Sequence, residues 1–179
     1  MPMPKNKMTA EEYFNTSPVT NKHIELRDGY VVDFASPTIL HQRIVRRLGS
    51  ELSQFIDKKG GKCEPFIAPL DVLLDDENVV QPDVFVVCDP SKLDDKRCYG
   101  APELVIEVVS SNRSDDYVRK LNLYLSAGVK EYWIIDPEKE RTLVYLFGDN
   151  TSINIYTFDQ PIPVGIYNGE LTITIADLV

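Results

Sequence analysis

Apolar residues recur at spacings of three and four over residues 39–58, which predicts the longest helix of the chain, with one buried stripe. The same spacing predicts a second helix over residues 115–127, closed by Gly128. A short helix is expected to begin at Thr9, where Thr-Ala-Glu-Glu has the form of a capping box, and to end before Pro18. The sequence therefore predicts three helices.

Short runs rich in Val, Ile and Phe, bounded by turn-forming residues, predict two buried strands, at residues 79–87 and 102–110. Before them, residues 62–74 are expected to form one long strand that bends at its prolines. An Asp-Gly turn predicts a hairpin over residues 23–34. Further strands are expected at residues 130–137, 142–147, 152–157 and 171–175. This order predicts a mixed α/β fold with an N-terminal hairpin and C-terminal β additions.

The length and composition of the chain indicate a globular protein. It has 179 residues, of which 43% are apolar and 26% are charged, so we expect one domain over residues 1–179. No apolar run is long enough to cross a bilayer, and the first residues lack the apolar stretch of a signal peptide. The expected location is therefore the cytoplasm, without a membrane partner.

The three cysteines, Cys63, Cys88 and Cys98, are odd in number and never occur at Cys-x-x-Cys spacing. This pattern favours neither a zinc knot nor a disulfide framework. We therefore expect three reduced thiols.

Acidic residues outnumber basic ones, 28 against 19, and the net charge is −9. That excess argues against a protein that coats nucleic acid electrostatically. It leaves open an enzyme that binds nucleic acid locally, especially where a divalent metal offsets an acidic site.

Each of the two buried strands carries a carboxylate: Asp83 follows Pro82 directly, and Glu107 lies within an apolar run. A carboxylate buried without a partner is strongly destabilising, so such groups are usually paired or bind a metal. If the two strands pair, both side chains point to one face, where hard oxygen ligands suit Mg²⁺ or Mn²⁺. The pair therefore predicts one shared divalent cation. For Asp83 alone, a carboxylate that only holds a turn or a strand end is an alternative.

The second predicted helix carries Asp116, Lys120 and Tyr124 at a spacing of four, so all three lie on one side. A lysine close to a metal-bound water can stabilise the hydroxide and the charge that develops on a phosphate. Lys120 by itself is also consistent with a solvated helix residue. Asp116 is better explained by an ion pair with Lys120, and Tyr124 by packing.

Pro82-Asp83 followed by Glu107-Val108-Val109 resembles the PD-(D/E)XK nuclease superfamily, except that Val109 stands where the lysine usually lies. In the Uma-two family of restriction-type endonucleases that lysine has moved to the following helix, and the chain is similar to this family over nearly its whole length. The similarity is carried by residues 24–32, 36–37, 41, 68–72, 80–83, 102–110, 116–129 and 131–137. The family usually has Ser-Pro-Ser after the Glu strand, where this chain has Ser-Ser-Asn at positions 110–112.

The resemblance implies a restriction-endonuclease-like core, in which helices flank a mixed central sheet. It implies that Asp83, Glu107 and the carbonyl of Val108 bind Mg²⁺ or Mn²⁺. It also implies that Lys120 orients the attacking water and stabilises the charge on the phosphate. Glu25 matches an acidic residue that such nucleases carry on an N-terminal element, where it binds the metal directly or through water.

Phosphate contacts are expected from a second group of residues. His41, at the head of the long helix, is expected to contact a phosphate or a group that holds the metal. A phosphate-binding rim is expected from basic side chains of the two long helices and the loop before the second: Arg43, Arg46, Arg47, Arg113 and Arg119. Plainer interpretations are an edge-strand charge for Glu25, a helix-start residue for His41 and solvated helix faces for the arginines.

The predicted activity is Mg²⁺- or Mn²⁺-dependent hydrolysis of phosphodiester bonds in DNA, with a homodimer cutting both strands. No base-reading module is recognisable, so we infer no sequence specificity. Two alternatives stay open. One is a catalytically inactive module of the same fold that binds metal or nucleic acid, and the other is an interaction protein whose strand carboxylates are paired internally.

Overall fold

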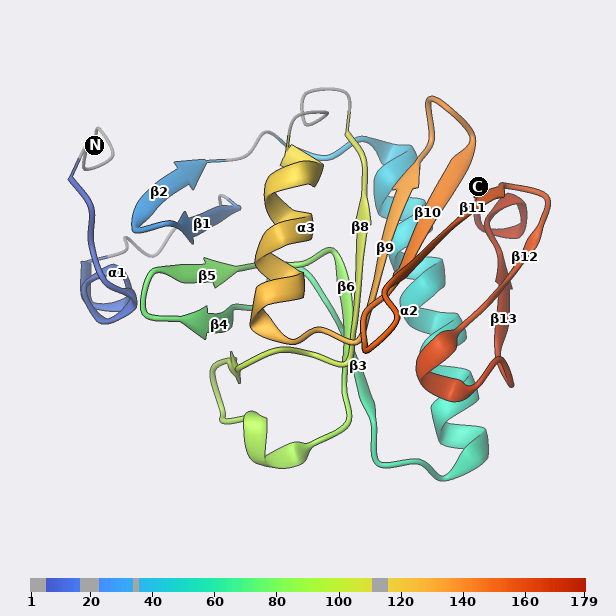
Figure 1. Ribbon diagram of the computed structural model, residues 1–179, viewed down its shortest axis with the longest axis horizontal. Helices are drawn as coiled ribbons and strands as arrows, with labels where there is room; N and C mark the ends of the chain where they lie inside the picture. The colour runs from blue at the N-terminus through green and yellow to red at the C-terminus, as the bar shows by residue number, and fades with distance from the viewer. Residues whose placement is uncertain (1–5, 17–22, 34–35, 111–115) are drawn as a thin grey trace.

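The computed structural model describes residues 6–16, 23–33, 36–110 and 116–179. A six-stranded mixed sheet forms its centre, in the order β11-β10-β9-β8-β6-β3 (Figure 1). Only β8 and β9 pair in parallel, while all other neighbours pair antiparallel. The strands are β3 (Glu64–Ile67), β6 (Val84–Val87), β8 (Leu104–Val108), β9 (Glu131–Asp136), β10 (Arg141–Leu146) and β11 (Ser152–Thr157). The mixed central sheet expected from the sequence is confirmed.

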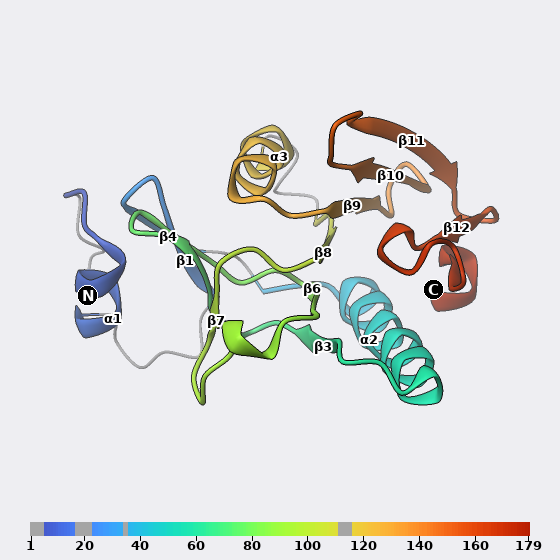
Figure 2. The ribbon, with the colours of Figure 1, turned by 60° about the horizontal axis from the view of Figure 1, so that its bottom comes forward.

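Two helices cover opposite faces of this sheet, as Figure 2 shows: α2 (Ile39–Lys59) and α3 (Asp116–Ala127). The apolar stripe of α2 packs on one face of the sheet. The helix residues buried there are Ile44, Val45, Leu48, Leu52 and Ile56, and the strand residues are Val84, Val86, Leu104, Ile106 and Val108. The opposite face buries Tyr124 of α3 with Phe85, Val87, Val105 and Tyr132. Alternate side chains of β6 and β8 are thus buried on both faces, which is why these strands read as continuous apolar runs. No helix among the described residues is long and apolar enough to cross a membrane.

A second sheet, in the order β2-β1-β5-β4-β7, lies beside the central one (Figures 1 and 2). Its strands are β1 (Ile24–Arg27), β2 (Tyr30–Asp33), β4 (Val72–Asp75), β5 (Asn78–Val80) and β7 (Cys98–Tyr99). The expected hairpin forms its edge, since β1 and β2 turn at Asp28 and Gly29, whose φ angles are 49° and 80°. Both turn residues therefore have positive φ angles, as a type I′ hairpin turn requires.

The short helix α1 (Ala10–Thr16) packs on this second sheet through Tyr13. Its capping box forms as expected. The backbone N–H of Thr9 donates to Glu12 Oε2 at 2.8 Å, and the backbone N–H of Glu12 donates to Thr9 Oγ1 at 3.2 Å. Two of the unpaired N–H groups at the helix start are therefore satisfied by side chains.

Two of the strands expected from the sequence are each divided between the two sheets. Residues 62–74 form β3 and β4, and the cis peptide Ala68–Pro69 lies between them. Residues 79–87 form β5 and β6, on either side of Pro82. Proline has no N–H to donate to a ladder, which accounts for both interruptions. Asp83 therefore lies directly before β6 rather than inside a strand.

The C-terminal part adds a small sheet of β12 (Pro161–Pro163) and β13 (Thr172–Thr174), of which the sequence predicts only the second. Short 3-10 turns are η1 (Pro90–Lys92), η2 (Gly165–Tyr167) and η3 (Ile175–Leu178). Glu131 ties η2 to β9, because its carboxylate accepts from the backbone N–H groups of Gly165 at 3.0 Å and Ile166 at 2.8 Å. The same carboxylate accepts from the indole N–H of Trp133 at 2.7 Å. Trp133 is fully buried, as expected of a core residue.

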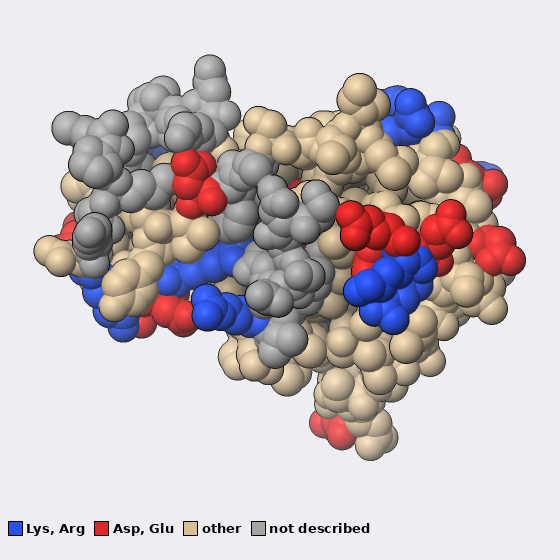
Figure 3. Space-filling view, turned by 90° about the horizontal axis from the view of Figure 1, so that it is seen from above, with Lys and Arg blue, Asp and Glu red and all other residues tan. Residues whose placement is uncertain are grey.

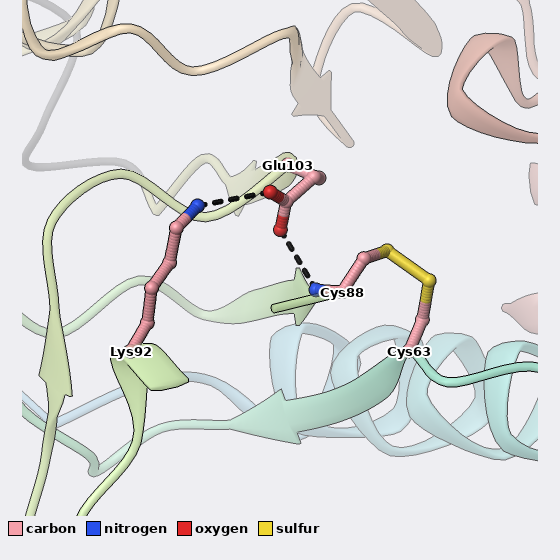
Figure 4. Close-up of a disulfide and its surroundings, with 4 residues drawn as sticks. All are labelled: Cys63, Cys88, Lys92 and Glu103. Carbon is pink, nitrogen blue, oxygen red and sulfur yellow. Dashed lines mark hydrogen bonds and ion pairs between the residues drawn. A yellow bond between two sulfur atoms is a disulfide. The ribbon is translucent and has the colours of Figure 1, made fainter. Parts of the chain in front are cut away.

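The expectation of three reduced thiols is wrong for two of them. Cys63 and Cys88 form a disulfide, shown in Figure 4, and their Cα atoms are 3.8 Å apart. The pairing of β3 with β6 explains it: Glu64 faces Val87, so positions 63 and 88 are the next pair outward. Sequence spacing could not reveal this contact, because it arises only once the two strands are in register. Cys98 is free, and burial raises the pKa of its thiol to about 11.

Candidate active site

Asp83 and Glu107 face each other where β6 and β8 meet. Val84 pairs with Ile106 at the end of the antiparallel register, and Asp83 and Glu107 are the residues directly beyond this pair. Both are almost completely buried, with exposed fractions of 2% and 3%. Residues opposite each other in an antiparallel pair project to the same face. The structure therefore brings together the two carboxylates that the sequence analysis singled out.

Asp83 is held by the protein through one of its two oxygens. Its Oδ2 accepts from the backbone N–H of Val108 at 2.8 Å and lies 3.1 Å from His41 Nε2. Burial alone raises the pKa of Asp83, but the hydrogen bond and charge of His41, together with the Val108 N–H, outweigh it and lower that pKa. Asp83 therefore remains ionised despite its burial.

His41 reaches Asp83 from the first turn of α2. Thr38 caps that helix, because its hydroxyl oxygen accepts from the backbone N–H of His41 at 3.1 Å. The His41 side chain is 4% exposed, and among the described residues its Nδ1 has no hydrogen-bond partner. The helix cap therefore fixes the backbone from which the imidazole meets Asp83.

Glu107 is held in the same way, also through one oxygen. Its Oε1 accepts from Lys120 Nζ and from the Tyr124 hydroxyl, both at 2.7 Å. Lys120 and Tyr124 lie one turn apart on α3 and are both buried. Burial raises the pKa of Glu107, and the nearby charges of Asp83 and Glu25 add to that rise, while Lys120 opposes it. The carboxylate cluster therefore resists full ionisation unless further positive charge is present.

Glu25 of β1 joins the cluster from the second sheet and is fully buried. Its Oε1 accepts from the backbone N–H of Gln81 at 2.9 Å and lies 3.5 Å from Lys120 Nζ, while Oε2 pairs with Arg27. Burial by itself raises the pKa of Glu25, but Lys120, His23 and Arg27 hold that pKa well below its usual range. Both oxygens of Glu25 therefore contact donors of the protein.

The donor atoms fit a hydrated Mg²⁺ or Mn²⁺ ion better than a metal held entirely by the protein. Within the described residues, no hydrogen bond engages Oδ1 of Asp83 or Oε2 of Glu107. The same residues contain no cluster of three or more His, Cys, Asp or Glu side chains that could hold a metal ion. Magnesium usually keeps several waters and binds through one or two carboxylates. Two carboxylates, each with one oxygen that no described residue contacts as a donor, match that requirement.

The remaining residues of the sequence prediction are more widely spread. Arg113 lies outside the described residues, as do positions 111–112 of the Ser-Ser-Asn segment and the side chain of Asp116. Arg47 donates to the carbonyl oxygens of Asp177 at 3.3 Å and Val179 at 3.0 Å, so it binds the C-terminal turn. Arg43, Arg46 and Arg119 are exposed. Of the expected phosphate rim, three side chains are thus available and one is engaged elsewhere.

Tyr124 is the site residue whose contact the sequence analysis did not foresee. Packing accounts for its ring, but its hydroxyl also donates to Glu107. The signal was present in the spacing of Lys120 and Tyr124, which puts both on the side of α3 that meets the sheet.

Comparison with solved structures defines the class of fold. A crystal structure described as a putative nuclease belonging to DUF820, from Anabaena variabilis, superposes with a TM-score of 0.78 at 23% identity, over 96% of this chain and 97% of that one. The chain therefore has the fold of that nuclease-like α/β protein.

The sequence itself places the chain in a family. It belongs to the Uma2 family, described as "Putative restriction endonuclease", which matches residues 10–173. A protein of Synechocystis sp. named "Uncharacterized protein slr1290" is 30% identical over 123 residues, or 68% of this chain. The matched part spans 64% of that relative, so less than two thirds of its length. The resemblance drawn from Asp83, Glu107 and the displaced Lys120 is confirmed at the level of the family.

Proposed function

We propose that the chain, acting as a single domain, is a Mg²⁺- or Mn²⁺-dependent endonuclease that hydrolyses phosphodiester bonds in DNA. One observation carries the proposal. Asp83, directly before β6, and Glu107 of β8 lie just beyond the paired residues Val84 and Ile106, and Lys120 Nζ lies 2.7 Å from Glu107 Oε1. A buried amine beside two buried carboxylates, each with one oxygen that accepts no hydrogen bond from the described residues, is suited to binding a cation and a phosphate.

In this proposal Asp83, Glu107 and the carbonyl of Val108 hold the metal ion. Bound there, the ion would supply a Lewis acid and a water of lowered pKa. Lys120 donates a hydrogen bond that orients the attacking water and stabilises the negative charge that develops on the phosphate. The water oxygen forms a bond to phosphorus as one P–O ester bond breaks, which leaves a phosphomonoester and a free hydroxyl on the two DNA ends.

The other residues of the site act on these groups. His41 holds Oδ2 of Asp83, which would leave Oδ1 for the metal, and from the head of α2 it would also lie close to an incoming phosphate. Glu25 holds Lys120 at 3.5 Å and balances its charge, so that the ammonium stays between two carboxylates. Arg113 and the exposed Arg119, near the start of α3, would contact neighbouring phosphates.

Binding of DNA would be local rather than spread over the whole surface. Acidic and basic side chains are intermingled on the face seen in Figure 3, and the basic ones form no continuous band in the described part of that face. With a net charge of −9, non-specific attraction to DNA is weak. The metal ion and a few arginines would therefore supply most of the attraction to phosphate.

A homodimer would let two such sites cut both DNA strands, and β11 is the surface that supports one. It is an edge strand of six residues without a charged side chain, and it exposes Ile153 by 51% and Ile155 by 62%. Figure 2 shows it at the outer margin of the central sheet. Edge strands are usually protected by charges, prolines or bulges. The opposite edge strand, β3, carries Glu64 and Pro65, whereas antiparallel self-pairing of β11 would bring no like charges together.

The test is cleavage of supercoiled plasmid in the presence of Mn²⁺ by the wild type and by the Asp83→Asn variant. We expect nicked or linear products from the wild type and a loss of at least about 100-fold in the variant. Asp76→Asn, at an exposed acidic turn, should leave the rate unchanged. A wild type that binds Mn²⁺ or DNA without cutting would refute the endonuclease and leave the inactive binding module. A wild type that binds neither Mn²⁺ nor DNA would refute both the endonuclease and the binding module, and would favour an interaction protein whose strand carboxylates are paired internally.

A further inference from the structure

Two donors of one helix meet at a single oxygen of Glu107. Lys120 Nζ and the Tyr124 hydroxyl each lie 2.7 Å from Oε1, and both side chains come from α3, one turn apart. No hydrogen bond of the described residues reaches Oε2. The two oxygens of this carboxylate therefore differ: Oε1 accepts two hydrogen bonds, and Oε2 accepts none from the part of the chain that the structure describes.

Packing explains the Tyr124 ring but not its hydroxyl. Tyr124 is fully buried, and its ring lies against that of Tyr132 with centroids 4.9 Å apart. A phenylalanine would fill the same space without taking a hydroxyl out of water. The hydroxyl is compensated by its bond to a charged acceptor, which is stronger than a bond between neutral groups. The Tyr124 hydroxyl therefore contributes through its hydrogen bond to Glu107 and not through packing.

A carboxylate held by one donor can still turn, because the last torsion of a glutamate side chain is broad and nearly two-fold. With Lys120 alone, either oxygen could meet the ammonium, whose three donors can point in several directions. The Tyr124 hydroxyl comes from a rigid ring on a neighbouring turn and adds a second fixed direction. Together the two donors select Oε1 and keep Oε2 turned away from them.

We propose that Tyr124 is a positioning residue for the metal site: its hydroxyl locks the orientation of Glu107, so that Oε2 is presented to the divalent ion. This inference rests on the proposed function, because it concerns the same ion. Groups that orient metal ligands typically change metal affinity about 10- to 100-fold when they are removed. The hydroxyl is thus expected to affect the affinity of the site for metal more than the stability of the fold.

The experiment compares the Tyr124→Phe variant with the wild type by calorimetric titration with Mn²⁺ and by thermal melting without metal. We expect the variant to bind Mn²⁺ at least about 10-fold more weakly, with a melting temperature within a few degrees of the wild type. Plasmid cleavage should fall at low Mn²⁺ and recover at saturating Mn²⁺. Tyr145→Phe is the matched control, since its ring lies 6.1 Å from that of Tyr132 in the same aromatic row; it should bind Mn²⁺ as the wild type does.

A double variant separates positioning from general damage to the fold. In the Glu107→Gln background, Tyr124→Phe should change Mn²⁺ affinity no further, because the carboxylate that it orients is gone. Equal affinity of wild type and Tyr124→Phe, or an equal loss in both backgrounds, would overturn the positioning role while wild-type cleavage upholds the proposed function. A wild type without Mn²⁺ binding would overturn both.

Discussion

The ammonium group of Lys120 lies between two buried carboxylates, 2.7 Å from Glu107 Oε1 and 3.5 Å from Glu25 Oε1. Glu107 belongs to β8 in the central sheet, whereas Glu25 belongs to β1 in the second sheet. One side chain on α3 therefore joins the two sheets electrostatically. The proposed function also requires Lys120 to contact the phosphate. Its replacement is therefore expected to lower both the stability of the fold and the rate of DNA cleavage.

Replacing Lys120 with methionine keeps the volume of the side chain and removes its charge. We expect DNA cleavage to fall by at least about 100-fold, because the charge on the phosphate is no longer stabilised. We also expect a loss of stability of about 3–5 kcal/mol, since Glu25 and Glu107 remain buried without their shared counter-charge. Plasmid cleavage and urea unfolding measure the two effects. Lys58→Met, at an exposed position in the last turn of α2, should change neither; cleavage by Lys120→Met at the wild-type rate would contradict the assigned role.

Breaking the Cys63–Cys88 disulfide should destabilise the fold without touching the site. The bond spans 25 residues of sequence, and a loop of that size predicts a loss of about 3 kcal/mol for Cys63→Ser or for reduction of the wild type. Urea unfolding with and without a reducing agent measures it. The Cys63→Ser variant should be insensitive to the reducing agent. A wild type whose unfolding midpoint does not depend on the reducing agent would show that this bond adds no stability.

The pH dependence of stability should report the Glu103 network drawn in Figure 4. Its carboxylate accepts from Lys92 Nζ at 2.9 Å and from the backbone N–H of Cys88 at 2.8 Å. Burial raises the pKa of Glu103, but Lys92 and the Cys88 N–H outweigh burial, so the folded pKa lies below the ordinary value of 4.5. The unfolded chain therefore binds the proton first as pH falls.

The contribution of Glu103 is thus complete above pH 4.5 and is lost as pH falls through its lowered folded pKa. Glu103→Gln should melt at a lower temperature than the wild type at neutral pH, and the difference should shrink as pH falls below 4.5. Thermal melting across this range measures the difference. Glu138→Gln, at an exposed position, should follow the wild type throughout. A constant difference between Glu103→Gln and the wild type from neutral to acid pH would contradict the network as drawn.

A lysine in β11 should dissociate the proposed homodimer. Ile155→Lys places a charge on an uncharged edge strand, where a symmetric partner would bring the same charge close to it. We expect the wild type to sediment as a dimer and the variant as a monomer with an unchanged melting temperature. In plasmid cleavage, linear product should give way to nicked product. Ile67→Lys, on the opposite edge strand and 46% exposed, is the matched control; a wild type that is monomeric at all concentrations would refute the dimer.

Local signals in the sequence were sufficient for most of the elements. Thr9 and Glu12 are three residues apart, and the capping box that they form needs no other part of the chain. The apolar residues of α2 likewise recur at spacings of three and four, and this spacing alone predicts which side of the helix is buried. Where a contact joins distant segments, the same reasoning fails, as the disulfide shows. Cys63 and Cys88 meet only because β3 and β6 adopt one register.

By itself, the sequence determined the mixed α/β order and the family, and it singled out two carboxylates within or beside apolar runs, whereas Lys120 was singled out by the family resemblance. It could do so because a charged residue within or beside an apolar run departs from the usual hydrophobic pattern, and this departure can be recognised from the sequence alone. The tertiary structure decided how runs around proline divide between two sheets, and which oxygen of each carboxylate the protein occupies. Those outcomes depend on strand register and on the approach of α3 to β8, which are set by packing between segments far apart in the chain.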